Sequence, residues 1–195
     1  MKEQDSDVRK RRHLTPEEKY QIFIEATMAK AKEDMAIEVQ KGLIAQSLRF
    51  ISIPLTNVIE VEIDDIPVRD GSSSLKVKTP SPGAYIFHKG LVFSRRWEQQ
   101  KKAKDLYYIF DILANCLELR ERIINELREL KKGYTPWFRR FIKNLEVNFS
   151  NVTSDGVMLV FTQWPAGAFP NLNDEQFKQY VLGVFTEFIR EIKSF

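Results

Sequence analysis

Apolar side chains recur at helical spacing along residues 98–117, and this stripe constrains the fold more than any other feature of the sequence. Its members lie three or four residues apart, which places them on one face of an α-helix. Such a face has to pack against other apolar elements, so the chain must form a core. The stripe consists of Ala103, Leu106, Tyr107, Phe110, Leu113, Ala114 and Leu117.

Similar spacing predicts further helices before and after this stripe, and Gly133 is placed to end one of them. Alternating segments at 58–63 and 75–78 predict a pair of strands, and the apolar run 156–163 predicts a buried strand. The predicted fold class is therefore α+β, mainly helical, with a small β element. The predicted helices are 42–50, 84–96, 98–117, 120–132, 136–145 and a last one that begins at Asn173 or Asp174.

Residues 1–35 form a polar arm with a basic run at 9–12. Thr15 suits a helix cap and Pro16 suits the first helical position, so we expect a helix to about Asp34. This arm resembles the first helix of transposase-type helix-turn-helix proteins, but no recognition helix follows it. We interpret 1–35 as a basic helical arm, a transposase-like remnant or a fusion, and 36–195 as a separate domain.

Positive charge is concentrated in one part of the chain. The net charge is only +3, yet residues 75–104 hold eight Lys or Arg and a single acid, Glu98. A local excess of cations is suited to bind phosphates.

The sequence also predicts the cellular setting. Cys116 is the single cysteine and lies in an apolar helical segment, so we expect a buried thiol in a reducing compartment. We find no apolar run long enough to cross a membrane and no signal peptide at the start. A cytoplasmic protein that does not bind membranes is the resulting expectation.

Two neighbouring predicted helices carry the candidate binding residues. On the first, His88 and Arg95 lie seven residues apart, as do Lys89 and Arg96, and residues at this spacing share a helix face. On the second, the side opposite the apolar stripe carries cations together with Asp105 and Tyr108 as supporting residues. An antiparallel pair would bring both polar faces to one groove suited to a polyphosphate. The predicted ligands are His88, Lys89, Arg95, Arg96, Lys101 and Lys104.

Two other interpretations of these residues remain open. The charges would equally form a solvated helical surface with a few ion pairs, and His88 would be a structural histidine. In the groove, by contrast, Asp105 would hold one of these cations in place and would not bind the ligand itself.

Several sequence blocks resemble one family in the same order. Pro82, Ala84-Tyr85 and His88-Lys89 are followed by Arg95-Arg96 and by Lys104-Asp105-Leu106, with related segments upstream at 42–50 and 56–61. The pattern resembles the helical, carboxy-terminal part of the minimal nucleotidyltransferases. These belong to the DNA polymerase β-like superfamily and are similar to abortive-infection toxins. The resemblance covers about 42–195, which would be a nucleotidyltransferase-like C-terminal domain.

The resemblance implies a preceding catalytic half, in which a Gly-Ser turn and paired carboxylates hold two Mg²⁺ ions. Before Gly42 we find no such pattern, and Glu60 and Glu62 follow no glycine turn. We therefore expect no metal ligands, and Mg²⁺ only if a complete catalytic half is present. The expected function is nucleotidyltransferase-like binding of a nucleoside triphosphate or RNA by a chain that lacks the catalytic segment and is inactive alone.

Three alternatives remain. A separate catalytic or antitoxin chain would act as a partner. The protein would otherwise be an active, toxin-like, metal-dependent nucleotidyltransferase acting on RNA or protein. It would alternatively be a DNA-binding regulator that uses the basic arm.

Overall fold

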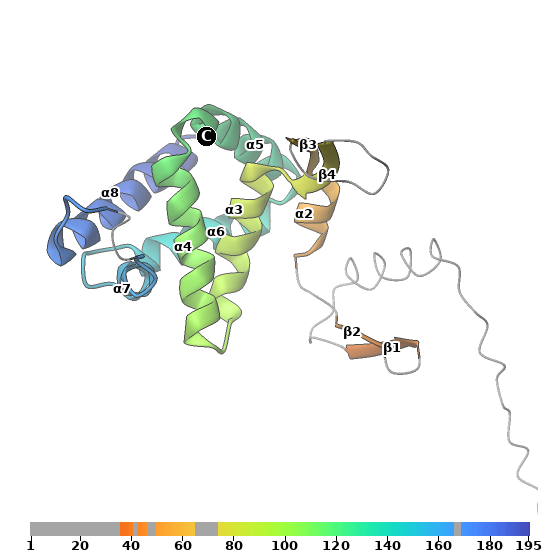
Figure 1. Cartoon of the computed structure of the whole chain (residues 1–195), viewed down its shortest axis with the longest axis horizontal. Coiled ribbons are helices and arrows are strands. Elements are labelled where there is room, and N and C mark those ends of the chain that lie inside the picture. The colour runs from red at the N-terminus through yellow and green to blue at the C-terminus, as the bar shows by residue number, and fades with distance from the viewer. Residues whose placement is uncertain (1–35, 41–42, 47–49, 65–73, 166–168) are drawn as a thin grey trace, which may run out of the picture. The chain divides into compact units, whose positions relative to one another are not determined.

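The computed structural model describes residues 36–40, 43–46, 50–64, 74–165 and 169–195. The chain divides into two compact units, Met1–Arg49 and Phe50–Phe195. The fold is α+β and mainly helical, as the sequence predicts (Figure 1). Within the described residues, no helix has the length and hydropathy needed to cross a membrane.

The first unit contains two antiparallel strands, β1 (Ala36–Gln40) and β2 (Leu43–Gln46). The helix predicted at 42–50 is therefore wrong. A helix this short is marginal by itself, whereas the preceding segment supplies a strand with which β2 exchanges backbone hydrogen bonds. The helix predicted between Thr15 and Asp34 lies outside the described residues.

The second unit begins with α2 (Ser52–Thr56) and an antiparallel hairpin of β3 (Val58–Asp64) and β4 (Ser74–Pro80). Both predicted strands are confirmed. The register pairs Val61 with Val77 and Glu60 with Lys78. Because side chains alternate along a strand, one face of the hairpin is apolar and the other is charged.

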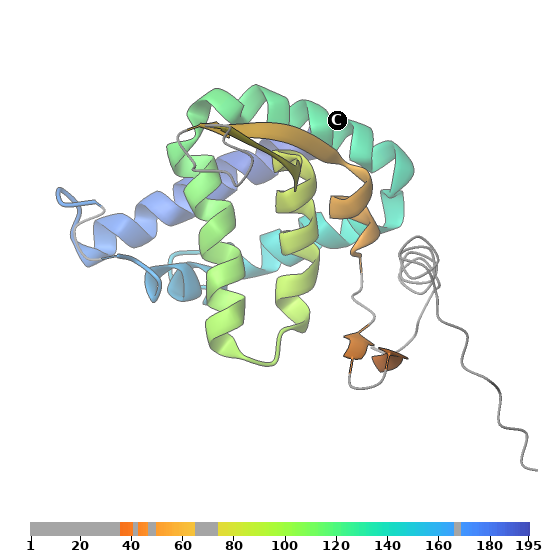
Figure 2. The same cartoon turned by 45° about the vertical axis from the view of Figure 1, so that its right-hand side comes forward.

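Two neighbouring helices follow, α3 (Pro82–Val92) and α4 (Gln99–Asn115), and they form a hairpin (Figures 1 and 2). Ser81 caps α3 by accepting a hydrogen bond from the Ala84 N–H. The predicted helix 84–96 ends too late, because a short 3₁₀ turn, η1 (Phe93–Arg95), follows α3. Arg96 then has extended backbone. The break lets the chain reverse direction and start α4.

The remaining helices complete the bundle, and their predicted counterparts are confirmed except for one. After η2 (Leu117–Leu119), the helices α5 (Arg120–Gly133) and α6 (Thr135–Asn148) lead toward α8 (Asp174–Lys193). Asn173 and Gln176 form a reciprocal capping box that starts α8. Phenylalanines fill much of the core, and the fully buried ones are Phe87, Phe93, Phe110, Phe138, Phe141, Phe177, Phe185 and Phe188.

The exception is α7 (Asp155–Phe161), which replaces the strand predicted at 156–163. Gly156, Val157 and Val160 are buried, at helical spacing, while Met158 is 38% exposed. A short continuous apolar run fits a strand and a buried helix equally well until its neighbours are known. Here α4, α6 and α8 all pack on this segment, and no described strand lies beside it to pair with it.

Two smaller expectations about α4 are also corrected. Leu117 was expected on the core stripe but is 66% exposed, because α4 ends at Asn115. Cys116 was expected to be buried but is only half-buried, at the end of the same helix. Burial raises the pKa of the Cys116 thiol, and the nearby carboxylates of Glu118 and Asp111 raise it further.

Candidate functional site

Asp105 holds the α3–α4 hairpin together through two cations. Its carboxylate oxygens lie 2.5 Å from Lys89 Nζ and 2.9 Å from Arg96 Nε. The Asp105 side chain is 5% exposed, compared with 18% for Lys89 and 38% for Arg96. A buried carboxylate needs such compensation, because transfer of an unpaired charge out of water is strongly unfavourable. Asp105 on α4 therefore fixes the positions of Lys89 from α3 and Arg96 from the turn between the helices.

Two tyrosines flank this cluster. Lys89 Nζ lies 5.5 Å from the ring centre of Tyr85 and 5.8 Å from that of Tyr108, within cation–π range. Burial raises the pKa of Tyr85 to about 12, and the negative charge of Asp105 and the neighbouring Tyr108 add to the shift. Tyr85 therefore keeps its proton at ordinary pH.

This shift predicts a specific alkaline behaviour. Because Tyr85 binds its proton more tightly when folded, its contribution to stability is complete below pH 10 and is lost as the pH rises toward 12. In Tyr85→Phe, we expect a smaller decrease of unfolding free energy across this window, measured by urea denaturation. Spectroscopic titration of tyrosinate should also lose its last step. If the dependence of unfolding free energy on pH and the tyrosinate titration curve were both unchanged in Tyr85→Phe, the raised pKa of Tyr85 would be contradicted.

The structure separates Arg95 from the other predicted ligands. Its guanidinium carbon lies 5.7 Å from the ring centre of Phe50, next to α2, whereas Arg96 contacts Asp105 on α4. The predicted seven-residue alignment of His88 with Arg95 assumed one continuous helix, and α3 ends at Val92. The expectation that all four cationic residues lie on adjoining faces of one helix is therefore wrong.

The two predicted lysines of α4, Lys101 and Lys104, differ in their ion pairing. Lys101 Nζ lies 2.7 Å from Glu98 in a solvent-exposed ion pair. Lys104 is exposed, and within the described part of the chain no acid pairs with it. At helical spacing Lys101, Lys104 and Tyr108 lie on adjacent positions of the face that carries Asp105. His88 is half-buried, one residue before Lys89.

The cluster brought together by contacts therefore contains Lys89, Arg96, Asp105 and Tyr108, and Tyr85 joins it. We call these five residues the Asp105 cluster. Tyr85 was not among the binding residues predicted from the sequence. Its position four residues before Lys89 was a usable signal, because that spacing places two side chains on one helix face.

The acidic residues of the β3–β4 hairpin are engaged with their neighbours. Glu60 lies 3.8 Å from Lys76 Nζ, and Glu62 accepts a hydrogen bond of 2.7 Å from the Ser74 hydroxyl. Among the residues whose placement is described, no three His, Cys, Asp or Glu side chains gather in a way that would hold a metal ion. Within this part of the chain, nothing assembles the carboxylate set that two-metal phosphoryl transfer requires.

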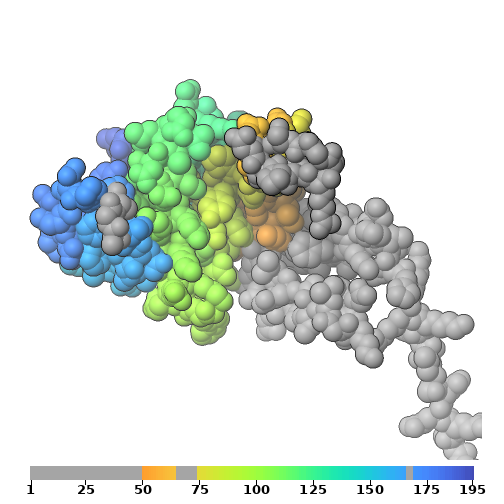
Figure 3. All heavy atoms as spheres, in the orientation of Figure 1, coloured from red at the N-terminus to blue at the C-terminus, as the bar shows by residue number. Residues whose placement is uncertain are grey.

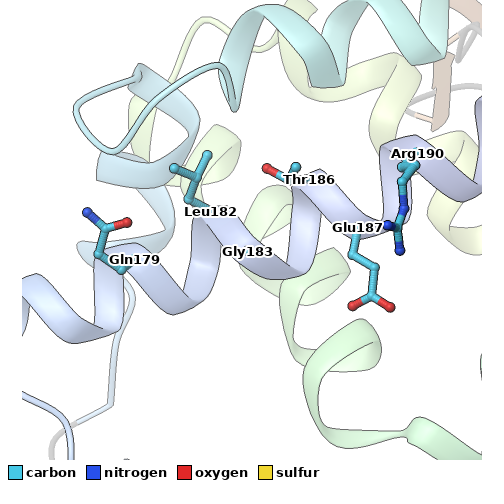
Figure 4. Close-up of a pocket in the computed structure, with 6 residues that line it drawn as sticks. All are labelled: Gln179, Leu182, Gly183, Thr186, Glu187 and Arg190. Atoms are coloured by element: carbon cyan, nitrogen blue, oxygen red, sulfur yellow. The ribbon is translucent and has the colours of Figure 1, made fainter.

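Two surface hollows formed by described residues lie away from the predicted ligands. One is a depression on the outer face of α8, lined by Gln179, Leu182, Gly183, Thr186, Glu187 and Arg190 (Figure 4). All six residues come from one helix, so this is an open surface and not an enclosed cavity. A second, near the start of α3, is lined partly by Glu126 and Glu129, whose charges disfavour phosphate. The Gly83 N–H at that helix start already donates to Glu126, at 2.7 Å.

Comparison with known protein families shows which family matches this arrangement of strands and helices. A family model described as nucleotidyltransferase matches residues 2–129, more than half of the chain. The match includes both strands of the β3–β4 hairpin, the whole α3–α4 hairpin and most of α5. It begins before residue 42, so it also covers the amino-terminal arm, whose relation to transposases stays a prediction. No curated protein and no solved structure matches the chain significantly. The chain belongs to this nucleotidyltransferase family.

Proposed function

We propose that this nucleotidyltransferase-family chain binds the phosphates of a nucleoside triphosphate on the α3–α4 hairpin, between the Asp105 cluster and Lys104. The metal-binding carboxylates needed for transfer are supplied from outside the residues described above. Under this proposal, a separate catalytic chain, or an antitoxin that blocks the site, is the partner to look for.

The observation that carries the proposal is the pairing of one buried carboxylate with two cations. Asp105 neutralises only one of the charges on Lys89 and Arg96, so the cluster keeps a net positive charge. Its ion pair with Arg96 uses Nε, and among the described residues none pairs with the two Nη groups. A guanidinium held in this way is preorganised, and it offers its remaining donors to a phosphate at a low entropic cost.

Neighbouring groups extend this positive surface. Lys104 precedes Asp105 on α4, and Lys101 lies one helical turn earlier, paired with an exposed acid that a stronger anion can displace. Tyr108 is 44% exposed and lies four residues after Lys104. A triphosphate that contacts Arg96 and Lys104 would therefore have an aromatic ring close to its nucleoside. This arrangement favours a nucleotide over free phosphate.

The Lys104→Ala variant tests the site without disturbing the fold, because Lys104 makes no ion pair with a described residue. We expect its affinity for ATP to fall about ten- to hundredfold, since a hydrogen bond to a charged group contributes about 1.5–3 kcal/mol. Isothermal titration with ATP, CTP and RNA measures this. Arg140→Ala on α6 removes another exposed cation elsewhere and should leave the affinity unchanged. Equal affinities for wild type and Lys104→Ala would reject the site.

Arg95 and Arg96 are adjacent in the chain but have different partners, so their alanine variants form a matched pair for testing the site. Arg96→Ala should weaken ATP binding, whereas Arg95→Ala should have little effect, because Arg95 lies over Phe50. If both variants behave alike, the ligand does not use the Asp105 cluster.

Transfer activity is a separate question with its own assay. We expect no incorporation of labelled nucleotide into RNA by the purified chain with Mg²⁺. Incorporation that disappears on Glu60→Ala or Glu62→Ala would show instead that the chain is an active metal-dependent enzyme. Glu60 and Glu62 of the β3–β4 hairpin would then leave Lys76 and Ser74 and bind the metal.

A further inference from the structure

Trp97 is 99% exposed, in the turn between η1 and α4. The other two tryptophans both stack on aromatic rings, Trp137 on Tyr134 and Trp164 on Phe177. The turn lies at the end of the α3–α4 hairpin that is farthest from α5 (Figure 2). In the space-filling view, yellow-green residues form the lower end of the part drawn in colour (Figure 3). Transfer of a large aromatic ring out of water lowers the free energy. An indole that stays fully exposed in the free protein is therefore typical of a residue that becomes buried when a partner binds.

The surroundings of Trp97 are cationic and not apolar. Arg96 precedes it directly, and Lys101 and Lys102 follow in the first turn of α4. Glu98, the residue after Trp97, is the one acid here and pairs with Lys101, so the cations outnumber it. Phe93, in the preceding turn, is 1% exposed, so it does not extend the indole into a wider apolar surface. A membrane or an apolar protein face would need such a surface. A single ring among cations instead suits a ligand with flat aromatic groups and regularly spaced negative charges.

Single-stranded nucleic acid has this chemistry. Its bases stack on aromatic side chains with little sequence preference, and its phosphates bind lysine and arginine. We propose that Trp97 and the cations beside it form a binding surface for single-stranded nucleic acid, in which the indole stacks on a base and the cations contact the flanking phosphates. The inference rests on the proposed function for one point, that this strand is the acceptor in the transfer reaction.

The position of the surface agrees with that role. Trp97 follows Arg96 in the chain, and Arg96 belongs to the Asp105 cluster, to which we assign the triphosphate. A strand stacked on the indole would therefore run beside the nucleotide. In this arrangement the α3–α4 hairpin binds both the nucleoside triphosphate and the acceptor strand, and binding of each can be tested separately.

Binding of labelled strands to the full-length chain, followed by fluorescence anisotropy, tests the surface. The strands are a single-stranded RNA, DNA of the same sequence, and an abasic strand with the same number of phosphates. We expect Trp97→Ala to weaken binding of both base-bearing strands about tenfold and of the abasic strand hardly at all, since stacking contributes about 1–3 kcal/mol per base. Trp97→Phe should keep most of the affinity. A preference between RNA and DNA would identify the natural strand.

Leu117→Ala is the matched control, because Leu117 is also exposed, at 66%, just beyond the other end of α4. Unchanged RNA affinity in Trp97→Ala, or an equal loss with the abasic strand, would overturn the proposal. So would binding of the chain to anionic vesicles, but not to RNA, that depends on Trp97. Trp97→Ala should keep its affinity for ATP, so failure of the triphosphate site and failure of the strand surface give different results.

Discussion

The Asp105→Ala variant is expected to lose about 3 kcal/mol of unfolding free energy, because removing one partner of a buried ion pair leaves the others uncompensated. The Asp105 side chain is 5% exposed and that of Lys89 is 18% exposed, so water cannot fully replace the lost contact. Arg96 is more exposed, which places the expected effect at the lower end of the range for buried pairs. Urea denaturation of both proteins measures the difference.

Glu98→Ala supplies the matched control within the same hairpin. Glu98 pairs with Lys101 at 2.7 Å, but both side chains are more than half exposed, and such pairs contribute less than about 1 kcal/mol. Asp105→Asn keeps the shape of the side chain while removing its charge. Its loss of unfolding free energy should lie between those of Asp105→Ala and Glu98→Ala. If Asp105→Ala were no more destabilising than Glu98→Ala, the cluster would not organise the hairpin.

Phe141→Ala is expected to lower the unfolding free energy by about 3–5 kcal/mol, as truncation of a buried phenylalanine does. Phe141 is fully buried, and its ring lies against those of Phe87, Phe138 and Phe188 on three different elements. No single neighbour can move to fill the space that its loss would leave. Thermal and urea denaturation should both report the change.

The same ring explains why α3 carries a glycine at position 90. A Cβ there would lie 2.3 Å from Phe141 Cε2, so Gly90→Ala should destabilise by about 1–3 kcal/mol. In the Phe141→Ala background the added methyl group meets open space, and the penalty should disappear. Additive effects of the two substitutions would contradict this packing.

Gly183→Ala on α8 is the control for Gly90→Ala. Nothing lies within 4 Å of a Cβ built at Gly183, and the residue is in a helix interior. Alanine should therefore stabilise the protein there, by about 0.5–1 kcal/mol. Opposite signs for two identical substitutions would show that the contact with Phe141, and not the loss of a glycine, decides the result.

The helices could be predicted where one apolar face alternates with a polar one. In α4, Leu106, Phe110 and Leu113 recur at helical spacing and are all buried, so the pattern alone indicates the element and its inward face. In α7 the pattern failed. Val157 through Phe161 are all apolar, and such a run carries no periodicity that separates a strand from a helix.

Part of the Asp105 cluster could be predicted from the sequence, but its geometry could not. The excess of cations over acids in residues 75–104 was visible in the sequence, and an ion pair of Asp105 with a neighbouring cation was among the expectations. Arg95 was nevertheless paired with His88, because one helix was expected to continue to Arg96, and Tyr85 was not predicted. The exposure of Trp97 could not be predicted, since an indole beside charged residues packs inward in some folds and outward in others.

The sequence by itself determined which segments are amphipathic and where positive charge accumulates, because both properties follow from the order of side chains along the chain. Only the tertiary structure decided where α3 ends, which arginine meets Asp105 and which tryptophan stays in solvent. These outcomes depend on neighbours distant in sequence: Phe50 beneath Arg95, α4 beside Lys89, and no described residue packed over Trp97. Local propensity does not contain this information, because burial and ion pairing are properties of the assembled core.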